Sequence, residues 1–408
     1  MRQDIRRSPW QPLKVDPDEF RPDPHVGFAK YRPLAGLLDF GMGLPVVTRY
    51  ADVEALMTDP RTRQMETEVL EVRGITSGPL HDFYANSMLV SNPPAHIRRR
   101  APVARAFALK LIQAWRPRIR QLAMELIEAQ ASAQDIDFVE ALAAPLPARI
   151  IAEILGTPQG DAQHFSALVY KMSRGLGGFR DAEHETIDAS TGELIAYVAD
   201  LLNARRAAPR DDFLTDYIRK VDEHGELSEA ETLIQIVTLI IAGSDTTRFG
   251  FTALVLLLLQ HRDQWQAVCG DLERVPGAVR EALRFEPPVG SIGRVVTAPL
   301  TVADVALEAG TFLNLSIISA QRDEAVFKDP QRFDIARQDH PQWSVTFGFG
   351  PHRCLGEALA RAELEEALIA LSQRLPGLEL IGEPAMPKGY TGIRGITPMR
   401  VGWSRGQG

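Results

Sequence analysis

The chain has 408 residues, of which 45% are hydrophobic and 24% are charged, as in ordinary globular proteins. Its 45 basic and 53 acidic residues give a net charge of −8, which argues against a general binder of nucleic acid or of an anionic membrane. The two cysteines, Cys269 and Cys354, are too few for a disulfide framework and indicate a reducing compartment.

The predicted elements begin with an extended N-terminal segment and then become mainly helical. Seven prolines fall within residues 1–45 and predict extended chain that leads to a short strand at 45–49. Helices are predicted at residues 94–108, 110–132, 137–155, 161–172, 182–206, 228–261, 276–284 and 356–374. Short strands are predicted at residues 289–301, 302–307, 311–315 and 398–403. Neither a repeat nor a linker divides the chain, so we expect one domain over residues 1–408, mainly α with a minor β part.

No targeting or membrane segment is predicted. Residues 1–20 carry charges and prolines where a secretory signal would need an uninterrupted apolar stretch. The most apolar stretch, residues 233–260, is interrupted by polar residues 244–248 and cannot supply the ~20 consecutive apolar residues of a membrane span. We therefore expect a cytoplasmic protein without a membrane anchor.

The predicted helix at 228–261 is the longest, about 50 Å at 1.5 Å per residue. It is apolar throughout except at its centre, which indicates that a partner group lies against its middle.

Two other kinds of site are not indicated by the sequence. Residues 175–180 and 348–353 begin like dinucleotide-binding loops but lack the sixth-position glycine, and no Walker sequence occurs. The nine histidines form no HExxH motif, so neither nucleotide binding nor a zinc site built by the protein is expected.

The strongest motif is Phe347-Gly-Phe-Gly-Pro-His-Arg-Cys354-Leu-Gly356, directly before a helical pattern. Its glycines permit a tight loop and close approach to a flat group, and N–H groups at the following helix start can point at the sulfur. The motif resembles the haem-binding loop of the cytochrome P450 family, FGxGxHxCxG, at every fixed position. The resemblance implies a P450-like fold with the long central helix over haem b, and Cys354 as the thiolate that ligates the iron. It also implies that four further residues of the loop lie around the cofactor: Phe347, Gly348, His352 and Gly356. The alternative is a buried free cysteine in a glycine-rich turn, which is our interpretation of Cys269.

Two further segments resemble motifs of the same family in the expected order. Glu281-Ala-Leu-Arg284 resembles the ExxR motif, whose spacing puts both charges on one helix face, and Pro330-Gln-Arg332-Phe333 resembles PxRF. The resemblance implies a buried network of Glu281, Arg284 and Arg332 that fixes the cysteine loop and retains haem. For an ExxR alone, a solvated ion pair is the simpler interpretation.

Residues 242–247 of the long helix read Ala-Gly-Ser-Asp-Thr-Thr and resemble the oxygen-activation segment AGxDTT. Reduction of O2 requires two protons, so the resemblance implies catalytic roles for Asp245, which admits protons from solvent, and Thr246, which hydrogen-bonds to the bound oxygen. Family members that use peroxide directly tend to lack this pair, so its presence favours O2 with electron delivery. The alternative is a polar cluster that caps a second helix.

By the same resemblance, four donors would bind the haem propionates: His96, Arg100, Arg294 and His352. Each alone can also be interpreted as a surface cation. The residue before the Pro93-Pro94 pair is Asn92, whereas many relatives have an acid there, so the local cap is expected to differ.

Substrate contacts are the least constrained part of the resemblance. It points to residues 74–90, to a lid at residues 171–180 and to residues 391–393. The specific contacts predicted are Phe83, Tyr84, Ile241, Ala242, Val289 and Ile292, and the possible lid hinges are Gly175, Gly177 and Gly178. These side chains are mostly apolar and predict a small or medium hydrophobic substrate, although Arg174, Arg180 or Ser244 could recognise a carboxylate or hydroxyl.

The resulting hypothesis is a bacterial-type haem-thiolate monooxygenase that inserts one oxygen atom from O2 by hydroxylation, epoxidation or oxidative dealkylation. The chain leaves no room for a fused electron-transfer domain, so electrons would come from a separate ferredoxin and ferredoxin reductase. A positive docking face could be formed by Arg98, Arg99, Arg100, Arg105, Arg353 and Arg361, although a solvated helix face explains the same cluster. The alternatives are a haem-thiolate sensor or carrier without turnover, a peroxide-driven enzyme, and a helical scaffold without haem.

Overall fold

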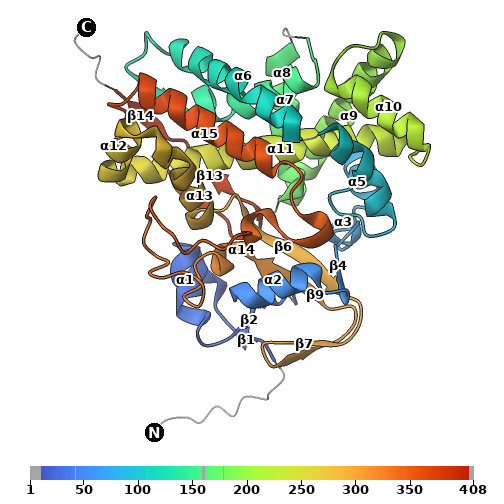
Figure 1. The fold of residues 1–408 in the computed structure, drawn as a ribbon. Helices are drawn as coiled ribbons and strands as arrows, with labels where there is room; N and C mark the ends of the chain where they lie inside the picture. The colour runs from blue at the N-terminus through green and yellow to red at the C-terminus, as the bar shows by residue number, and fades with distance from the viewer. Residues whose placement is uncertain (1–10, 42, 108, 159–160, 178, 404–408) are drawn as a thin grey trace.

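The computed structural model describes residues 11–41, 43–107, 109–158, 161–177 and 179–403. Over these residues the chain forms a large helical part that lies against a smaller part built around a β-sheet (Figure 1). The predicted class, mainly α with a minor β part, is confirmed. Residues 1–10 of the predicted extended segment, and the hinge candidate Gly178, lie outside the described residues.

The larger sheet brings together strands from the two ends of the chain. Its order is β1-β2-β3-β9-β6-β12, and β4 pairs with β6 outside this path. β3 and β9 pair in parallel, whereas β6 runs antiparallel to β9, β4 and β12. The strands are β1 (Leu13–Lys14), β2 (Leu37–Asp39), β3 (Val46–Val47), β4 (Thr62–Arg63), β6 (Val289–Val296), β9 (Phe312–Ser316) and β12 (Gly392–Ile393). β6 is therefore the strand through which the N-terminal and C-terminal segments meet.

Three smaller β units complete the described strands. β5 (Asp135–Asp137), β14 (Arg400–Gly402) and β10 (Glu379–Leu380) form a three-stranded sheet in the helical part. Two two-stranded sheets pair β7 (Leu300–Val302) with β8 (Val305–Leu307) and β11 (Pro387–Lys388) with β13 (Gly395–Ile396). The predicted strand at 289–301 is thus two strands, and the one at 398–403 is confirmed as β14.

The helices predicted from periodicity are present, with several short helices that the pattern did not indicate. The first group is α1 (Pro24–Tyr31), α2 (Tyr50–Thr58), α3 (Glu68–Glu71), α4 (Pro79–Asn86), α5 (Ala95–Ala106), α6 (Leu109–Glu128), α7 (Pro145–Ile154) and α8 (Ala162–Ser173). The second group is α9 (His184–Ala207), α10 (Phe213–His224), α11 (Glu229–Gln260), α12 (Arg262–Gly270), α13 (Val275–Phe285), α14 (Ile317–Ala320) and α15 (Glu357–Arg374). The helix predicted at 137–155 is divided into a π-helical turn at Val139–Ala143 and α7, which begins at Pro145. A proline lacks the N–H that a helix interior needs but fits its first turn.

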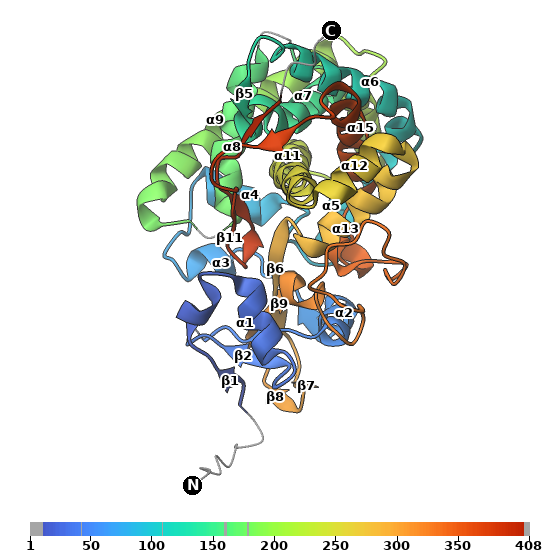
Figure 2. The ribbon, with the colours of Figure 1, turned by 90° about the vertical axis from the view of Figure 1, so that its left-hand side faces the viewer.

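The central helix α11 begins at a capping box, in which the Ser228 hydroxyl accepts from the Glu231 N–H and the Glu231 carboxylate accepts from the Ser228 N–H. It is long and apolar enough for a membrane span by length and composition, yet its most apolar window is 78% buried inside the protein. Seen nearly along its axis in Figure 2, α11 passes through the middle of the helical part with α7, α8 and α15 around it. It is therefore a core helix.

Candidate functional site

The cysteine loop between Val345 and Gly356 is a closed turn. The N–H of Cys354 donates to the Phe347 carbonyl over 2.8 Å, which ties the two ends of the turn together. Gly348 and Gly350 have φ values of 72° and 67°, a left-handed conformation that favours glycine. A Cβ on Gly350 would also come within 2.9 Å of Thr58 Cγ2 in α2. The glycine pattern of the motif is thus required by the backbone of this turn.

The Cys354 thiol lies just before the N-terminus of α15 and has an accessible side chain. The protein atoms packed around the thiol partly remove it from water, which raises its pKa. The pKa is lowered by the Gly356 N–H, which points at the sulfur, and by the nearby charges of Arg100 and Arg353. A Cβ on Gly356 would meet no atom within 4 Å, so there is open space at the start of α15, and the Cys354 side chain is itself exposed. The structure therefore presents one sulfur, supported from the backbone side, to a space that could take a flat group.

Close to this loop lies a group of donors without acidic partners. The rings of His96 and His352 have centroids 3.9 Å apart, and both nitrogens of His96 and Nε2 of His352 are buried without a hydrogen-bond partner. Burial lowers the pKa of His96 to about 4, and burial together with the charge of His96 lowers that of His352 to about 3.

Arg294 and Arg100 complete this group. Arg294 is 3% exposed, and burial lowers its pKa to about 10. Arg100 donates to the Arg353 carbonyl over 2.6 Å. Within the described part of the chain, no Asp or Glu forms an ion pair with either arginine. Buried cations and orphaned imidazoles at one place fit a ligand with carboxylate groups, as haem has in its two propionates.

The centre of α11 presents a narrow accessible stripe. Ala242 is exposed and Thr246, one turn later, is half-buried, although most of the helix is buried. The Thr246 hydroxyl donates to the Ala242 carbonyl over 2.9 Å. Such a bond leaves the hydroxyl oxygen able to accept from a further donor.

Asp245 lies beside this stripe but is 8% exposed and is held by Arg248, whose Nε donates to its Oδ1 over 2.8 Å. Burial raises the pKa of Asp245, while the charges of Arg248 and Arg174 lower it. The Arg248 guanidinium also stacks on Tyr170, with its carbon 4.7 Å from the ring centroid. The carboxyl is therefore a buried group whose charge is stabilised by Arg248, in direct contact, and by the charge of Arg174.

The ExxR pair is fully buried. Arg284 donates to Glu281 through Nε at 2.8 Å and Nη2 at 2.7 Å, with 1% and 0% of the two side chains exposed. Hydrogen bonds from Arg284 and His340 overcome the effect of burial and hold the pKa of Glu281 at about 2. The predicted side-chain role of Arg332 was wrong, because its guanidinium is 73% exposed and only its backbone carbonyl accepts from Arg284.

Arg337 takes the place predicted for Arg332. Its Nε lies 3.2 Å from Glu281 Oε1, and His340 Nε2 lies 3.3 Å from Glu281 Oε2. The sequence pattern missed both residues because the chain turns after Pro330 and directs residue 332 outward. Arg284 also donates to the Gln321 carbonyl over 2.9 Å, and the Gln321 amide donates to Ser344 at the start of the cysteine loop. The network is thus connected through Gln321 to the residue that precedes the cysteine loop.

The predicted substrate contacts divide into two groups. Val289 and Ile292 are half-buried and remain candidates with Ala242. Phe83 and Ile241 are 0% exposed and present no surface to a ligand, which contradicts their prediction as contacts. Tyr84 is 6% exposed and donates its hydroxyl to the Gly175 carbonyl over 2.9 Å, so it holds the predicted lid segment.

A second buried ion network was not anticipated by any motif. Glu286 accepts from His25 Nε2 at 2.8 Å, Arg322 Nη2 at 3.1 Å and Arg394 Nη1 at 2.6 Å. These partners are separated from Glu286 by up to 261 positions, so no local pattern could have revealed them. The network ties α1 and the turn after β12 to the end of α13.

The predicted positive docking face is partly held by ion pairs within the protein. Arg98 and Arg99 both pair with Glu231, and Arg353 and Arg361 pair with Glu357. Arg105 contacts the His224 ring and Arg100 binds a carbonyl. Four of the six arginines therefore share two glutamates, and the cluster keeps a net positive charge.

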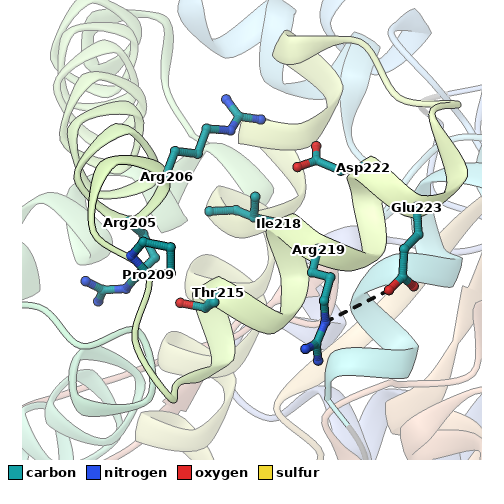
Figure 3. Close-up of a pocket in the computed structure, with 8 residues that line it drawn as sticks. All are labelled: Arg205, Arg206, Pro209, Thr215, Ile218, Arg219, Asp222 and Glu223. Atoms are coloured by element: carbon teal, nitrogen blue, oxygen red, sulfur yellow. Dashed lines mark ion pairs between the residues drawn. The ribbon is translucent and has the colours of Figure 1, made fainter.

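A surface pocket of about 530 Å³ lies between α9 and α10 (Figure 3). Arg219 pairs with Glu223 one turn later along α10, and Arg205 is held by Asp212 at 2.7 Å. None of the residues discussed above as candidate ligands lines it, so it is separate from the cysteine site.

Comparison with known proteins supports one family. The model of the family described as Cytochrome P450 matches residues 162–376. The plant-inducible cytochrome P450-pinF1 of Rhizobium radiobacter is 40% identical over 394 residues, covering 95% of this chain and 93% of that protein. Nocardicin C N-oxygenase of Nocardia uniformis subsp. tsuyamanensis is 34% identical, covering 89% and 90%.

Among solved structures, P450BioI in complex with an acyl carrier protein carrying hexadec-9Z-enoic acid has a TM-score of 0.87 at 26% identity. The match covers 95% of this chain and 100% of that one. Members of this family bind haem b, in agreement with the sulfur, the open space beside it and the unpaired cationic groups. The chain belongs to the cytochrome P450 family of haem-thiolate oxidoreductases.

Proposed function

We propose that this protein is a monooxygenase that inserts one atom of O2 into a small or medium hydrophobic substrate, with Cys354 as the ligand of the haem iron. The observation that carries the proposal is the Cys354 sulfur, which faces open space and receives the Gly356 N–H. Burial raises the pKa of the thiol, and the Gly356 N–H with the nearby guanidinium groups lowers it in part, in the direction that a thiolate ligand requires. When bound, a haem with an axial thiolate supplies the O2 activation that oxygen insertion requires.

His96, Arg100, Arg294 and His352 would hold the two propionates. This role accounts for buried donors that find no acidic partner in the described protein. Charge-assisted hydrogen bonds of this kind are stronger than neutral ones and would fix the orientation of the cofactor.

Asp245 and Thr246 would hold and transfer protons on the side of the site that α11 forms. Thr246 lies on the accessible stripe of α11, and its hydroxyl oxygen can accept a hydrogen bond from a water or from a protonated oxygen at the site. Asp245 can carry a proton from outside when its contact with Arg248 opens, because burial favours its neutral form. The pair therefore supports turnover and argues against a sensor or carrier without turnover.

The substrate would lie between the α11 stripe and β6. The candidate surfaces there, Ala242, Val289 and Ile292, are apolar and favour hydrophobic ligands. Relatives carry names such as nocardicin C N-oxygenase and mycinamicin IV hydroxylase/epoxidase, which are consistent with a role in secondary metabolism.

Electrons would come from a cytoplasmic ferredoxin and its reductase. Because four of the six predicted arginines are held by glutamates, the proposed anchor is the exposed Trp343, 49% accessible, on which the Arg353 guanidinium stacks at 3.9 Å. Arg353 directly precedes Cys354, so a partner bound there would be close to the sulfur. Tryptophan and arginine are enriched among residues that dominate binding energy at interfaces.

The test is a spectrum of the purified protein, with the reduced CO complex recorded for the parent chain and for Cys354→Ser. A thiolate-type spectrum in the parent and its loss in Cys354→Ser are expected, whereas an unchanged spectrum would place the ligand elsewhere. Cys269→Ser is the matched control and should behave as the parent. Titration with small aromatics, aromatic acids, terpenoids and fatty acids should then give a saturable high-spin shift with one class.

Turnover is tested by Thr246→Ala with a substrate found in that titration. This variant should bind haem normally but divert NAD(P)H-derived electrons to peroxide. Equal product per NAD(P)H would contradict the proposed role of Thr246. Absence of NAD(P)H consumption by the parent with ferredoxin and reductase would favour the sensor or carrier.

A further inference from the structure

Arg294 has an uncharged partner where a buried arginine usually has a carboxylate. Its Nη1 donates to the side-chain carbonyl of Gln64 over 2.7 Å and to the Gly293 carbonyl over 3.0 Å. Its guanidinium makes no other hydrogen bond to the described residues, although a guanidinium has five N–H donors in a fixed plane. Gln64 therefore fixes one edge of the plane, while the positive charge and the remaining donors stay available.

Gln64 is itself held by a reciprocal pair with Asn92. The Gln64 N–H donates to Asn92 Oδ1 over 2.8 Å, and Asn92 Nδ2 donates to the Gln64 carbonyl over 3.2 Å. Arg63 Nη1 donates to the same carbonyl over 2.9 Å. The side-chain amide of Asn92 both accepts and donates in this pair, whereas a carboxylate can only accept. The reciprocal pair therefore depends on an amide at position 92. We call this pair of residues the Gln64–Asn92 clasp.

The clasp lies between the two elements that carry the proposed propionate donors. On one side, Arg63 of β4 pairs with Val295 of β6, next to Arg294. Met65 packs so closely on β6 that a Cβ on Gly293 would come within 2.6 Å of its sulfur. The strand that carries Arg294 is thus in direct register with the chain at Gln64.

On the other side, the clasp leads into α5. The Asn92 carbonyl accepts from the His96 N–H over 3.0 Å, and its own N–H donates to Glu66 Oε1 over 3.0 Å. α5 then carries the His96 ring and Arg100. A shift of Asn92 would therefore move these donors relative to Arg294.

We propose that Gln64, held by Asn92, is a positioning residue for haem, which aligns Arg294 with His96 and Arg100 and leaves the Arg294 charge for the propionates. The inference rests on the proposed role of these donors. A neutral carbonyl orients the guanidinium without neutralising it, whereas a carboxylate at position 64 would pair with Arg294 and add a negative charge beside the propionates. Outer-shell partners of this kind typically change cofactor or metal affinity by 10- to 100-fold.

The experiment compares Gln64→Glu with the parent holoprotein by two measurements that do not depend on a substrate. The first is the ferric/ferrous reduction potential, and the second is the rate of haem transfer to apomyoglobin. Gln64→Glu should have a more negative potential, because added negative charge favours ferric haem, and should lose haem about 10-fold faster. Gln338→Glu, the same charge change at an exposed residue, is the control and should match the parent.

Gln64→Leu separates positioning from charge. It removes the acceptor without adding a charge, so haem loss should accelerate while the potential stays nearer to that of the parent. Parent-like haem loss in both Gln64→Leu and Gln64→Glu would overturn the inference. If Gln64→Glu fails to retain haem, Gln64→Leu decides the question alone by its rate of haem loss. The parent's thiolate-type CO spectrum tests the ligation by Cys354 separately, so the two proposals can fail independently.

Discussion

Arg337 Nε lies 3.2 Å from Glu281 Oε1, and this contact joins the segment after Pro330 to the helix that carries the ExxR motif. The Arg337 side chain is 6% exposed and also donates to the carbonyls of Lys328, Asp329 and Arg332. One guanidinium therefore holds both a buried carboxylate and the turn that precedes the cysteine loop.

We predict that Arg337→Ala destabilises the protein by about 2 kcal/mol and weakens haem retention. Removing one partner of a buried ion network leaves the carboxylate less well compensated, although Arg284 and His340 still bind Glu281. The change is measured as the urea midpoint at constant m-value. Arg332→Ala is the matched control and should stay within about 0.5 kcal/mol, because its side chain is 73% exposed. The reverse order of the two variants would contradict the assignment.

Acid should destabilise the fold through Glu281. The pKa of Glu281 is held at about 2 against an ordinary value of 4.5, so between these values the unfolded chain binds more protons than the folded one. The free energy of unfolding therefore falls as pH drops through this window, by about 3 kcal/mol in total, and is fully present above about pH 5. Urea unfolding at pH 6 and pH 3.5 measures the slope.

Glu281→Gln should flatten this pH dependence, since the titrating group is gone, while lowering stability at pH 6. Glu379→Gln, on the edge strand β10 and exposed, serves as the control. An unchanged slope in Glu281→Gln would assign the acid sensitivity to other groups, such as Glu286, whose pKa is also lowered by His25 and Arg394 despite its burial.

The contact between Asp245 and Arg248 should set the pH dependence of turnover. Burial raises the pKa of Asp245 and the Arg248 charge lowers it, so Arg248→Gln should raise the pKa further. The limb of the pH profile that depends on the protonated carboxyl should then move to higher pH. The measurement is O2 consumption driven by NAD(P)H, ferredoxin and reductase across pH.

Two further variants test whether this limb of the pH profile belongs to Asp245. Asp245→Asn should slow turnover about 100-fold, in the range of positioned proton-transfer groups, and should abolish that limb. Arg149→Gln changes an exposed arginine on α7 and should leave the profile unchanged. A profile in Arg248→Gln identical to that of the parent would remove Asp245 from the proton path.

Trp343→Ala should impair electron delivery without affecting the haem site. Loss of a tryptophan that anchors an interface typically costs more than 1 kcal/mol, so the second-order rate of reduction by ferredoxin should fall about 10-fold. Reduction by dithionite should be unchanged. Met386→Ala, another exposed apolar side chain, is the control. Equal rates with ferredoxin in parent and Trp343→Ala would place the docking surface elsewhere.

Much of the molecule follows from local sequence. The long apolar helix, the glycines at 348 and 350 and the i,i+3 pair of Glu281 and Arg284 are properties of neighbouring residues, and each was predictable. The fold class and the family followed from the order of these motifs. Such features depend on helical periodicity and on the φ angles that glycine allows, which act over a few residues.

The positions of long-range partners were decided only by the tertiary structure. The place predicted for Arg332 is taken by Arg337, because the turn after Pro330 rotates residue 332 to solvent. Phe83 and Ile241 have apolar side chains suited to a substrate pocket, yet packing buries both completely. A hydrophobic residue satisfies the same burial requirement in a core or against a ligand, so its type alone does not distinguish the two.

The sequence by itself determined the class of protein, the sulfur that can ligate haem and the central polar segment of the long helix, because these lie in contiguous motifs with strict local geometry. Only the tertiary structure decided that Gln64 meets Arg294, that Glu286 binds His25, Arg322 and Arg394, and that Arg98 and Arg99 pair with Glu231. Hydrogen bonds and ion pairs act over about 3 Å and require specific orientation, whereas these residues are separated by tens to hundreds of positions along the chain. Their meeting is a consequence of how the helices and the sheet pack.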